Sequence, residues 1–256
     1  MAHHTARGAY RRLVDRLEAF PQGAPPSDLL YRILELLFSE REAALVAQLP
    51  IRPFTAARAA GIWRMSEARA REVLDELAGL AILLDYELDG VCRWVLPPPM
   101  AGFFEFSMMR LRGDVDQKLL AELFQQYITV EDDFVRELFT VGETQLGRAF
   151  VNEHALPGEL SLHVLDHERA SAVIRSASVM GVSLCYCRHK AAHLGRACDA
   201  PLDICMTFGT VADSLIRHGF ARRVDVAEGI DLLATARARR LVQFGENVRE
   251  EVSFIC

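Results

Sequence analysis

The chain has 256 residues, of which 51% are hydrophobic and 25% are charged, so its composition is that of a folded globular protein and excludes a disordered one. Its formal net charge of −6 argues against a dedicated nucleic-acid-binding protein, although a local basic face is compatible with an acidic whole. The first residues are polar and basic with no apolar stretch behind them, and no apolar run is long enough to span a membrane. We therefore expect a cytoplasmic protein with no membrane association.

The N-terminal part of the chain is expected to be helical and to include a winged-helix-like arrangement. A helix over 54–61, a turn over 62–65 and a helix over 66–80 follow one another. Two alternating apolar stretches then flank Asp89-Gly90, a dipeptide that favours a β-hairpin. This order of helix, turn, helix and hairpin is that of a winged helix. Further helices are expected over 13–20, 29–38, 39–48 (opened by a capping box), 103–111, 116–127 and 132–139.

The rest of the chain is expected to form a small α/β module that carries most of the cysteines. A strand over 160–165, a helix to residue 177 and a strand over 179–184 lead the chain to Cys185. A helix is predicted from Cys205 to about Arg217, and another over 225–240. The predicted fold class is therefore α+β and predominantly helical. It comprises a winged-helix-like N-terminal domain over 1–145 and a small α/β cysteine-cluster module over 146–256.

Four of the six cysteines lie in one short stretch, at Cys185, Cys187, Cys198 and Cys205. A buried structural cysteine acts as a small hydrophobe and has no reason to gather with others. In a reducing cytoplasm, clustered cysteines are more typical of metal ligands than of disulfides. Structural zinc usually takes ligands about two to four residues apart, so the irregular spacing here favours a 4Fe–4S cluster. Zinc, and a disulfide or free thiols, remain as alternatives.

The residues around these cysteines suit an anionic cofactor. Basic side chains that follow Cys187 offset the charge of thiolates, and a helix beginning at Cys205 would direct its N–H groups at the cluster. Two glycines are expected to let the backbone approach the cluster closely, and a proline to stiffen the loop before Cys205. The predicted cluster environment comprises Arg188, His189, Lys190, Gly195, Pro201 and Gly209.

This stretch resembles a motif found in a group of prokaryotic 4Fe–4S-binding, ferredoxin-like proteins. The resemblance implies a winged-helix-like N-terminal region, a Cys-x-Cys-Arg module that binds a cluster, and a C-terminal ferredoxin domain with two clusters. The residues that carry it are Cys185-Tyr-Cys187-Arg-His-Lys190, Gly195, Cys198-Asp-Ala-Pro201 and Cys205-Met-Thr-Phe208-Gly209.

The sequence departs from the family pattern at its C-terminus. Residues 241–256 are similar to the lead-in to the family's ferredoxin domain, but the sequence stops at Cys256. We therefore expect a shortened chain that lacks this domain, with Cys256 as an idle or oxidisable thiol.

Two classes of function follow from the motif. The first is a non-catalytic electron-transfer protein or subunit, whose partner is a redox protein or the ferredoxin domain absent from this sequence. The second is a DNA-binding regulator that senses redox state through the cluster, with Arg64, Arg69 and Arg71 as candidate DNA contacts. The acidic residues of the same helix disfavour this second function. We also consider a homodimer formed through the N-terminal domain.

Overall fold

The computed structural model describes residues 2–140, 147–157, 164–165 and 168–256. They divide into two compact units, one of residues 1–143 and 186–197, the other of residues 144–185 and 198–256. The predicted class is confirmed, because the fold is α+β with helices predominating. In the described part of the chain, none of the helices has both the length and the apolar character needed to cross a membrane.

The first unit begins with three helices, and serine caps fix the starts of the second and third. Ser27 Oγ accepts a hydrogen bond from the Leu30 N–H group and so opens the second helix. At the third, Ser39 and Glu42 form the predicted capping box, in which each side chain accepts a hydrogen bond from the backbone N–H of the other. These helices are α1 (Ala2–Leu17), α2 (Asp28–Leu37) and α3 (Glu40–Val46).

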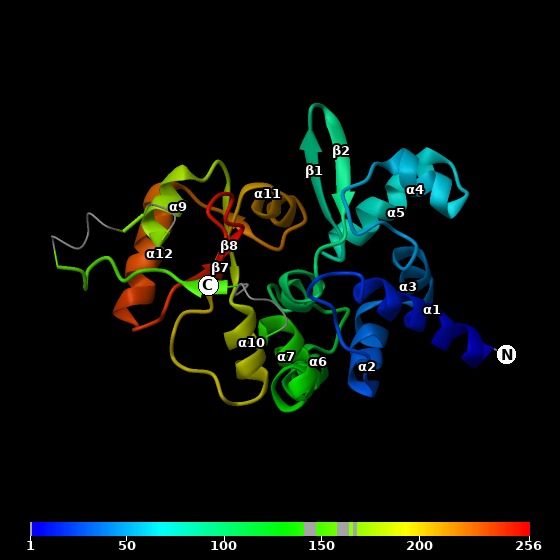
Figure 1. Cartoon of the computed structure of the whole chain (residues 1–256), viewed down its shortest axis with the longest axis horizontal. Coiled ribbons are helices and arrows are strands. Elements are labelled where there is room, and N and C mark those ends of the chain that lie inside the picture. The colour runs from blue at the N-terminus through cyan, green and yellow to red at the C-terminus, as the bar shows by residue number, and fades with distance from the viewer. Residues whose placement is uncertain (1, 141–146, 158–163, 166–167) are drawn as a thin grey trace. The chain divides into compact units, whose positions relative to one another are not determined.

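Two helices and a hairpin follow in the predicted order, and we call residues 54–95 the helix–hairpin segment (Figure 1). Ser66 caps its second helix as predicted. Asp89 and Gly90 both have positive φ, 53° and 73°, as a tight hairpin turn requires. Phe54 and Trp94 exchange two backbone hydrogen bonds of 2.9 Å, which tie the hairpin to the start of the segment. The elements are α4 (Ala56–Trp63), α5 (Glu67–Gly79), β1 (Leu84–Leu88) and β2 (Val91–Val95).

The remaining helices of the first unit enclose a cluster of aromatic rings. The ring of Phe104 lies within 5.0–6.0 Å of the rings of Phe103, Phe124, Tyr127 and Phe134. The helix that carries Cys187 packs on the helix that leads to this cluster. The sequence analysis predicted no helix there and placed these residues in the 146–256 module, whereas the structure groups them with the first unit. The elements are the kinked turn η1 (Met100–Phe104), α6 (Gln117–Phe124), η2 (Gln125–Val130), α7 (Asp132–Thr140) and α10 (Tyr186–His193).

The second unit is built on a six-stranded antiparallel sheet with the order β3-β7-β8-β5-β4-β6. Five of these six strands are absent from the sequence-based prediction, which included only β4. Residues 241–256, which resemble the lead-in to the family's ferredoxin domain, supply β7 and β8 to this sheet. The strands are β3 (Gly147–Ala149), β4 (Met180–Leu184), β5 (Asp203–Phe208), β6 (Arg222–Arg223), β7 (Phe244–Glu246) and β8 (Phe254–Ile255).

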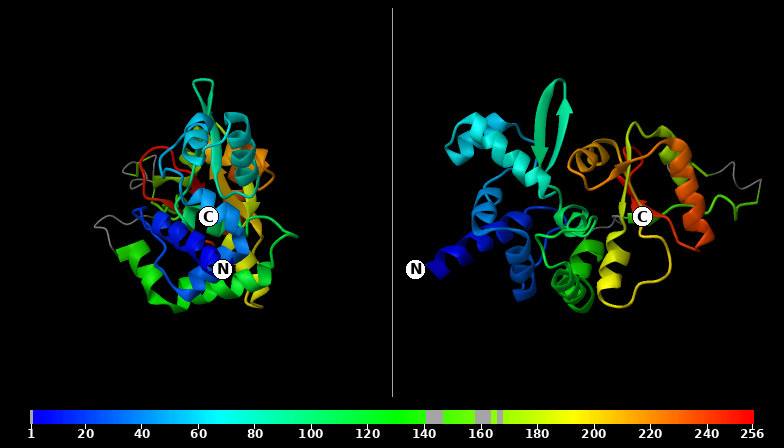
Figure 2. Two further views of the ribbon diagram at one scale, coloured as in Figure 1. Left: turned by 90° about the vertical axis from the view of Figure 1, so that its right-hand side faces the viewer. Right: turned by 180° about the vertical axis from the view of Figure 1, so that it is seen from behind.

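Helices cover both faces of this sheet, as the alternation of side chains along β4 shows. Met180 and Val182 belong to the core shared with α9 (Ala170–Ser176) and α12 (Val226–Ala238), which lie side by side (Figure 2). Gly181 points the other way, towards Ile216 of α11 (Gly209–Arg217). Most of the strand predicted over 160–165, and the predicted helix start at Asp166, lie outside the described residues.

The packing of α11 and the residues after it against β4 can be tested by adding a methyl group at Gly181. A Cβ atom at Gly181 would lie 2.9 Å from the Cβ of Ala221 and 3.3 Å from Thr207 Oγ1, so Gly181→Ala forces these groups apart. We expect a loss of about 1–2 kcal/mol in the free energy of unfolding, measured by chemical denaturation.

The matched control for Gly181→Ala is Gly61→Ala, because no atom lies within 4 Å of the added methyl in α4. The alanine should leave stability unchanged or raise it by up to about 1 kcal/mol. If Gly181→Ala lowers the free energy of unfolding no more than Gly61→Ala does, the packing over β4 is looser than described.

Candidate metal centre

The pairing of β4 with β5 places two of the four clustered cysteines on neighbouring strands. Cys205 lies opposite Ser183, and the register shifts between Ser183 and Leu184. Beyond this shift the Cys185 N–H group donates a hydrogen bond of 2.6 Å to the Leu202 carbonyl. The backbone therefore fixes Cys185 and Cys205 near the same end of the two strands.

The thiols of these two cysteines share apolar surroundings. Cys185 is 4% exposed and belongs to a small buried cluster, against which the half-buried Cys205 packs. Aliphatic side chains thus shield the Cys185 side chain from water and shield Cys205 in part. The other members of this cluster are Ile204, Leu232, Ala236 and Leu241.

The other two cysteines are exposed and lie on the connection between β4 and β5. Cys187 is in the first turn of α10, in the first unit, and Cys198 follows that helix in the second unit. The six cysteines all lie in the described residues, and no disulfide joins any two of them. Over residues 2–140, 147–157, 164–165 and 168–256, no group of three or more His, Cys, Asp or Glu side chains is placed so as to hold a metal ion. The described arrangement thus brings Cys185 and Cys205 to one cluster and leaves Cys187 and Cys198 outside it.

The predicted helix start at Cys205 is wrong. Cys205 lies inside β5, where Ile204, Met206 and Phe208 are buried and the backbone pairs with β4, and α11 begins four residues later at Gly209. Gly209 has φ +60° and donates its N–H to the Val179 carbonyl, so its conformational freedom serves the turn from strand to helix. The helix-terminus argument made for Cys205 therefore no longer applies to that residue.

Several residues predicted to surround a cluster have structural roles. Gly195, with φ +66°, ends α10, and the next N–H group, that of Arg196, donates back to the Ala191 carbonyl at 2.8 Å. The Lys190 ammonium lies 5.6 Å from the ring centroid of Tyr186, and burial lowers the pKa of Lys190 while the charge of Cys187 raises it. Arg188 is half-buried on α10, and Pro201 precedes β5 in the connection.

His189 is buried within the first unit, and its place beside a cluster stays a prediction. Its Nδ1 lies 2.6 Å from the Met108 carbonyl oxygen, and its Nε2 lies 3.2 Å from the Nε2 of His193. Burial lowers the pKa of His193, and the neighbouring His189 lowers it further. The sequence analysis named His189 only as part of the predicted cluster environment, and did not pair it with His193. The spacing of four residues, one helical turn, is the signal that links them.

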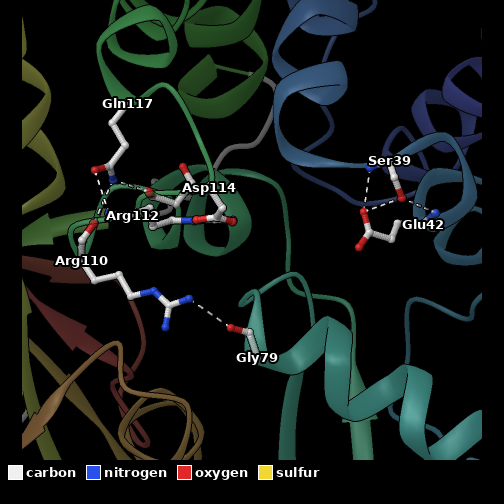
Figure 3. A network of polar contacts seen from close by, with 8 residues as sticks. Ser39, Glu42, Gly79, Arg110, Arg112, Asp114 and Gln117 are labelled. Atoms are coloured by element: carbon white, nitrogen blue, oxygen red, sulfur yellow. Dashed lines mark hydrogen bonds and ion pairs between the residues drawn. The ribbon is translucent and has the colours of Figure 1, made fainter.

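The backbone that presents the Met108 carbonyl is held by the buried Gln117 amide (Figure 3). Its nitrogen donates to the carbonyls of Ser107 and Arg110 at 3.0 and 2.8 Å, and its oxygen accepts from the Arg112 N–H at 3.1 Å. Arg110 in turn donates to the Gly79 carbonyl at the end of α5. These bonds fix residues 107–112 and so fix the acceptor of His189.

The two remaining cysteines lie apart from the clustered four in sequence. Cys92 is on β2, where burial and then Asp85 raise the pKa of its thiol, an effect that Arg71 opposes. Cys256 exchanges two backbone hydrogen bonds of 2.8 Å with Phe244, while its side chain is exposed.

The candidate DNA contacts lie on the helix–hairpin segment, and two of the three side chains are engaged within it. Arg69 forms an ion pair of 2.6 Å with Glu72, and the Arg71 guanidinium lies 5.2 Å from the ring centroid of Trp94. Arg64 is exposed in the left-handed conformation that ends α4. Binding to DNA through Arg64, Arg69 and Arg71 stays a prediction.

Comparison of the chain with protein families, curated proteins and solved structures finds no match in any of the three. The resemblance to 4Fe–4S-binding proteins therefore rests on the motif residues alone.

The buried hydroxyl of Tyr186, between the first two clustered cysteines, allows a direct test of the packing of α10. Within the described residues this hydroxyl has no hydrogen-bond partner, and burial raises the pKa of Tyr186 well above its usual value. Tyr186→Phe removes an unsatisfied polar group, so we expect the free energy of unfolding to rise by about 1 kcal/mol.

The matched control for Tyr186→Phe is Tyr127→Phe, because the buried Tyr127 hydroxyl donates to the Pro25 carbonyl at 2.9 Å. Its loss should cost about 1 kcal/mol. Destabilisation of both variants by the same amount would show that Tyr186 has an acceptor after all.

Proposed function

We propose that the chain binds a 4Fe–4S cluster through Cys185, Cys187, Cys198 and Cys205 and serves as a non-catalytic electron-transfer protein. The observation that carries the proposal is the placing of Cys185 and Cys205 against one buried apolar cluster, with the other two cysteines on the single connection between their strands. Four soft thiolate donors within this stretch fit the needs of an iron–sulfur cluster.

The apolar neighbours of Cys185 and Cys205 have a clear role in this function. Ile204, Leu232 and Ala236 pack beside the two cysteines and reduce their exposure to water, and solvent exposure is one of the factors that set the reduction potential of a cluster. When bound, a 4Fe–4S cluster supplies one-electron transfer. Four protein ligands leave no iron open to a substrate, which favours electron transfer over catalysis.

Zinc is the competing ligand for the same thiols. A single tetrahedral ion requires all four sulfurs within about 2.3 Å of one point, whereas a cubane has a separate iron for each cysteine. With zinc or with a cubane, the exposed Cys187 and Cys198 have to move to the same metal as Cys185 and Cys205. Metal binding is therefore expected to change the conformation of residues 186–202. The irregular spacing along this connection favours the cubane.

The test is anaerobic purification followed by an absorption spectrum and analysis of iron, sulfide and zinc. We expect a broad band near about 400 nm that dithionite bleaches, with about four irons per chain. The variants Cys187→Ser and Cys205→Ser should each lose most of the bound iron, because a cluster with three thiolate ligands is labile.

The matched control is Cys92→Ser, which changes a cysteine far from this stretch in sequence and should leave the iron content unchanged. A colourless protein with one zinc per chain would replace the proposed cluster with a structural zinc site. Equal iron loss from Cys92→Ser and Cys205→Ser would refute the assignment of the four ligands.

A further inference from the structure

The two histidines of α10 form a pair whose geometry is not explained by the cysteine motif. Their Nε2 atoms lie 3.2 Å apart, and their ring centroids lie 4.9 Å apart with 41° between the ring planes. His189 is 5% exposed and His193 is half-buried, so the first ring is fixed in place and the second remains accessible at the surface of α10.

The hydrogen bond to Met108 determines which nitrogen of His189 is available. A carbonyl oxygen only accepts, so Nδ1 of His189 carries the hydrogen in the 2.6 Å contact. In the neutral ring the lone pair then lies on Nε2, which faces His193. Histidines that bind metals through one nitrogen commonly donate the other N–H to a backbone carbonyl, and this partner sets the ring orientation.

The separation of the two Nε2 atoms matches the span of a metal chelate. Two nitrogen ligands at about 2.0–2.1 Å from a tetrahedral zinc ion lie about 3.3 Å from each other. The observed 3.2 Å requires almost no movement of either ring. The spacing His189-x-x-x-His193 puts both side chains on one face of the helix, as in helical zinc sites.

We propose that His189 and His193 form a bidentate site for a divalent transition-metal ion of the zinc type, separate from the cysteine motif. Imidazole nitrogen is a preferred ligand for such ions. In the described part of the chain, no third His, Cys, Asp or Glu side chain completes the set, so water fills the remaining positions of an open site. The Asp116 carboxylate interacts favourably with positive charge at His193, and the Lys118 ammonium opposes it.

Binding changes the proton arrangement of the pair without a net release of protons. Without metal, one hydrogen lies between the two Nε2 atoms, on the His193 ring. With metal, that hydrogen leaves Nε2 and the neutral His193 ring carries its hydrogen on Nδ1. Both Nε2 lone pairs then bind the ion, and the bond from His189 to the Met108 carbonyl is kept.

The test uses the full chain with Cys185, Cys187, Cys198 and Cys205 replaced by serine, so that its outcome does not depend on the proposed cluster. After treatment with a chelator, zinc chloride is added and binding is followed by calorimetry at neutral pH. We expect one zinc ion per chain at the histidine pair. His193→Gln should weaken this binding at least about tenfold, since loss of even an outer-shell partner costs about 10- to 100-fold in metal affinity.

Further variants and a spectroscopic measurement distinguish zinc binding at this pair from zinc binding at other histidines and from unfolding of the variant. His154→Gln changes an exposed histidine of the second unit, and His3→Gln with His4→Gln removes the histidines near the N-terminus; both variants should bind zinc unchanged. Because Gln is tolerated at a half-buried helical position, His193→Gln should keep its helix content by circular dichroism. Long-range ¹H–¹⁵N spectra of the imidazole rings should show both Nε2 signals shifting when zinc is added.

The proposal fails if the cysteine-free chain does not bind zinc, or if His193→Gln binds it as tightly as the parent. It also fails if zinc binds while the Nε2 signals of His189 and His193 stay unchanged, because the ion then lies elsewhere. Loss of iron binding by the cysteine variants leaves this proposal untouched, since it concerns different ligands.

Discussion

The antiparallel pairing of β4 with β5 is the constraint on which the candidate metal centre depends. The shift of register after Ser183 places Cys205 and Cys185 near one end of the pair, and the Leu202 carbonyl holds the backbone of Cys185. Two thiols are thereby positioned by main-chain hydrogen bonds and by the apolar side chains around them. The other two depend on the connection, whose conformation the sheet does not dictate. In the candidate centre, Cys185 and Cys205 are therefore positioned before any metal binds, whereas the positions of Cys187 and Cys198 depend on the connection.

A buried amide has a comparable role in the first unit. Gln117 satisfies three backbone groups of residues 107–112, and a carbonyl of that segment orients the ring of His189. The ring is thus fixed by a chain of hydrogen bonds in which the Gln117 and His189 side chains are both buried. Removing the amide would leave buried carbonyls unpaired, which is costly in a low-dielectric interior. The orientation of one imidazole therefore depends on a side chain on a different helix.

Local interactions explain why much of the fold was predictable from the sequence. The Ser39 capping box, the Ser66 cap and the Asp89-Gly90 turn depend on residues within a few positions of each other, and each forms as predicted. The helix α10 was missed because only Tyr186 and His189 are buried on it, so it has little apolar periodicity. The gathering of cysteines predicted the candidate site, and the structure places two of the four, Cys185 and Cys205, against one apolar cluster. The burial of His189 could not be foreseen, because its partner Met108 lies 81 residues earlier in the chain.

The order of strands in the second sheet has a consequence for how the protein is made. β7 and β8 lie between β3 and β5, and among the described strands β3 pairs only with β7. These two strands are far apart in sequence: the hydrogen bond from Arg148 to the Val248 carbonyl joins residues 100 positions apart. During synthesis β3 and β5 leave the ribosome first, with the edges that will later face β7 and β8 still open. At roughly 10 residues per second, the wait from β3 to β7 lasts about 10 s. A nascent chain thus carries unpaired strand edges throughout this interval, which makes it the period in which pairing with the edge of another chain is most favoured.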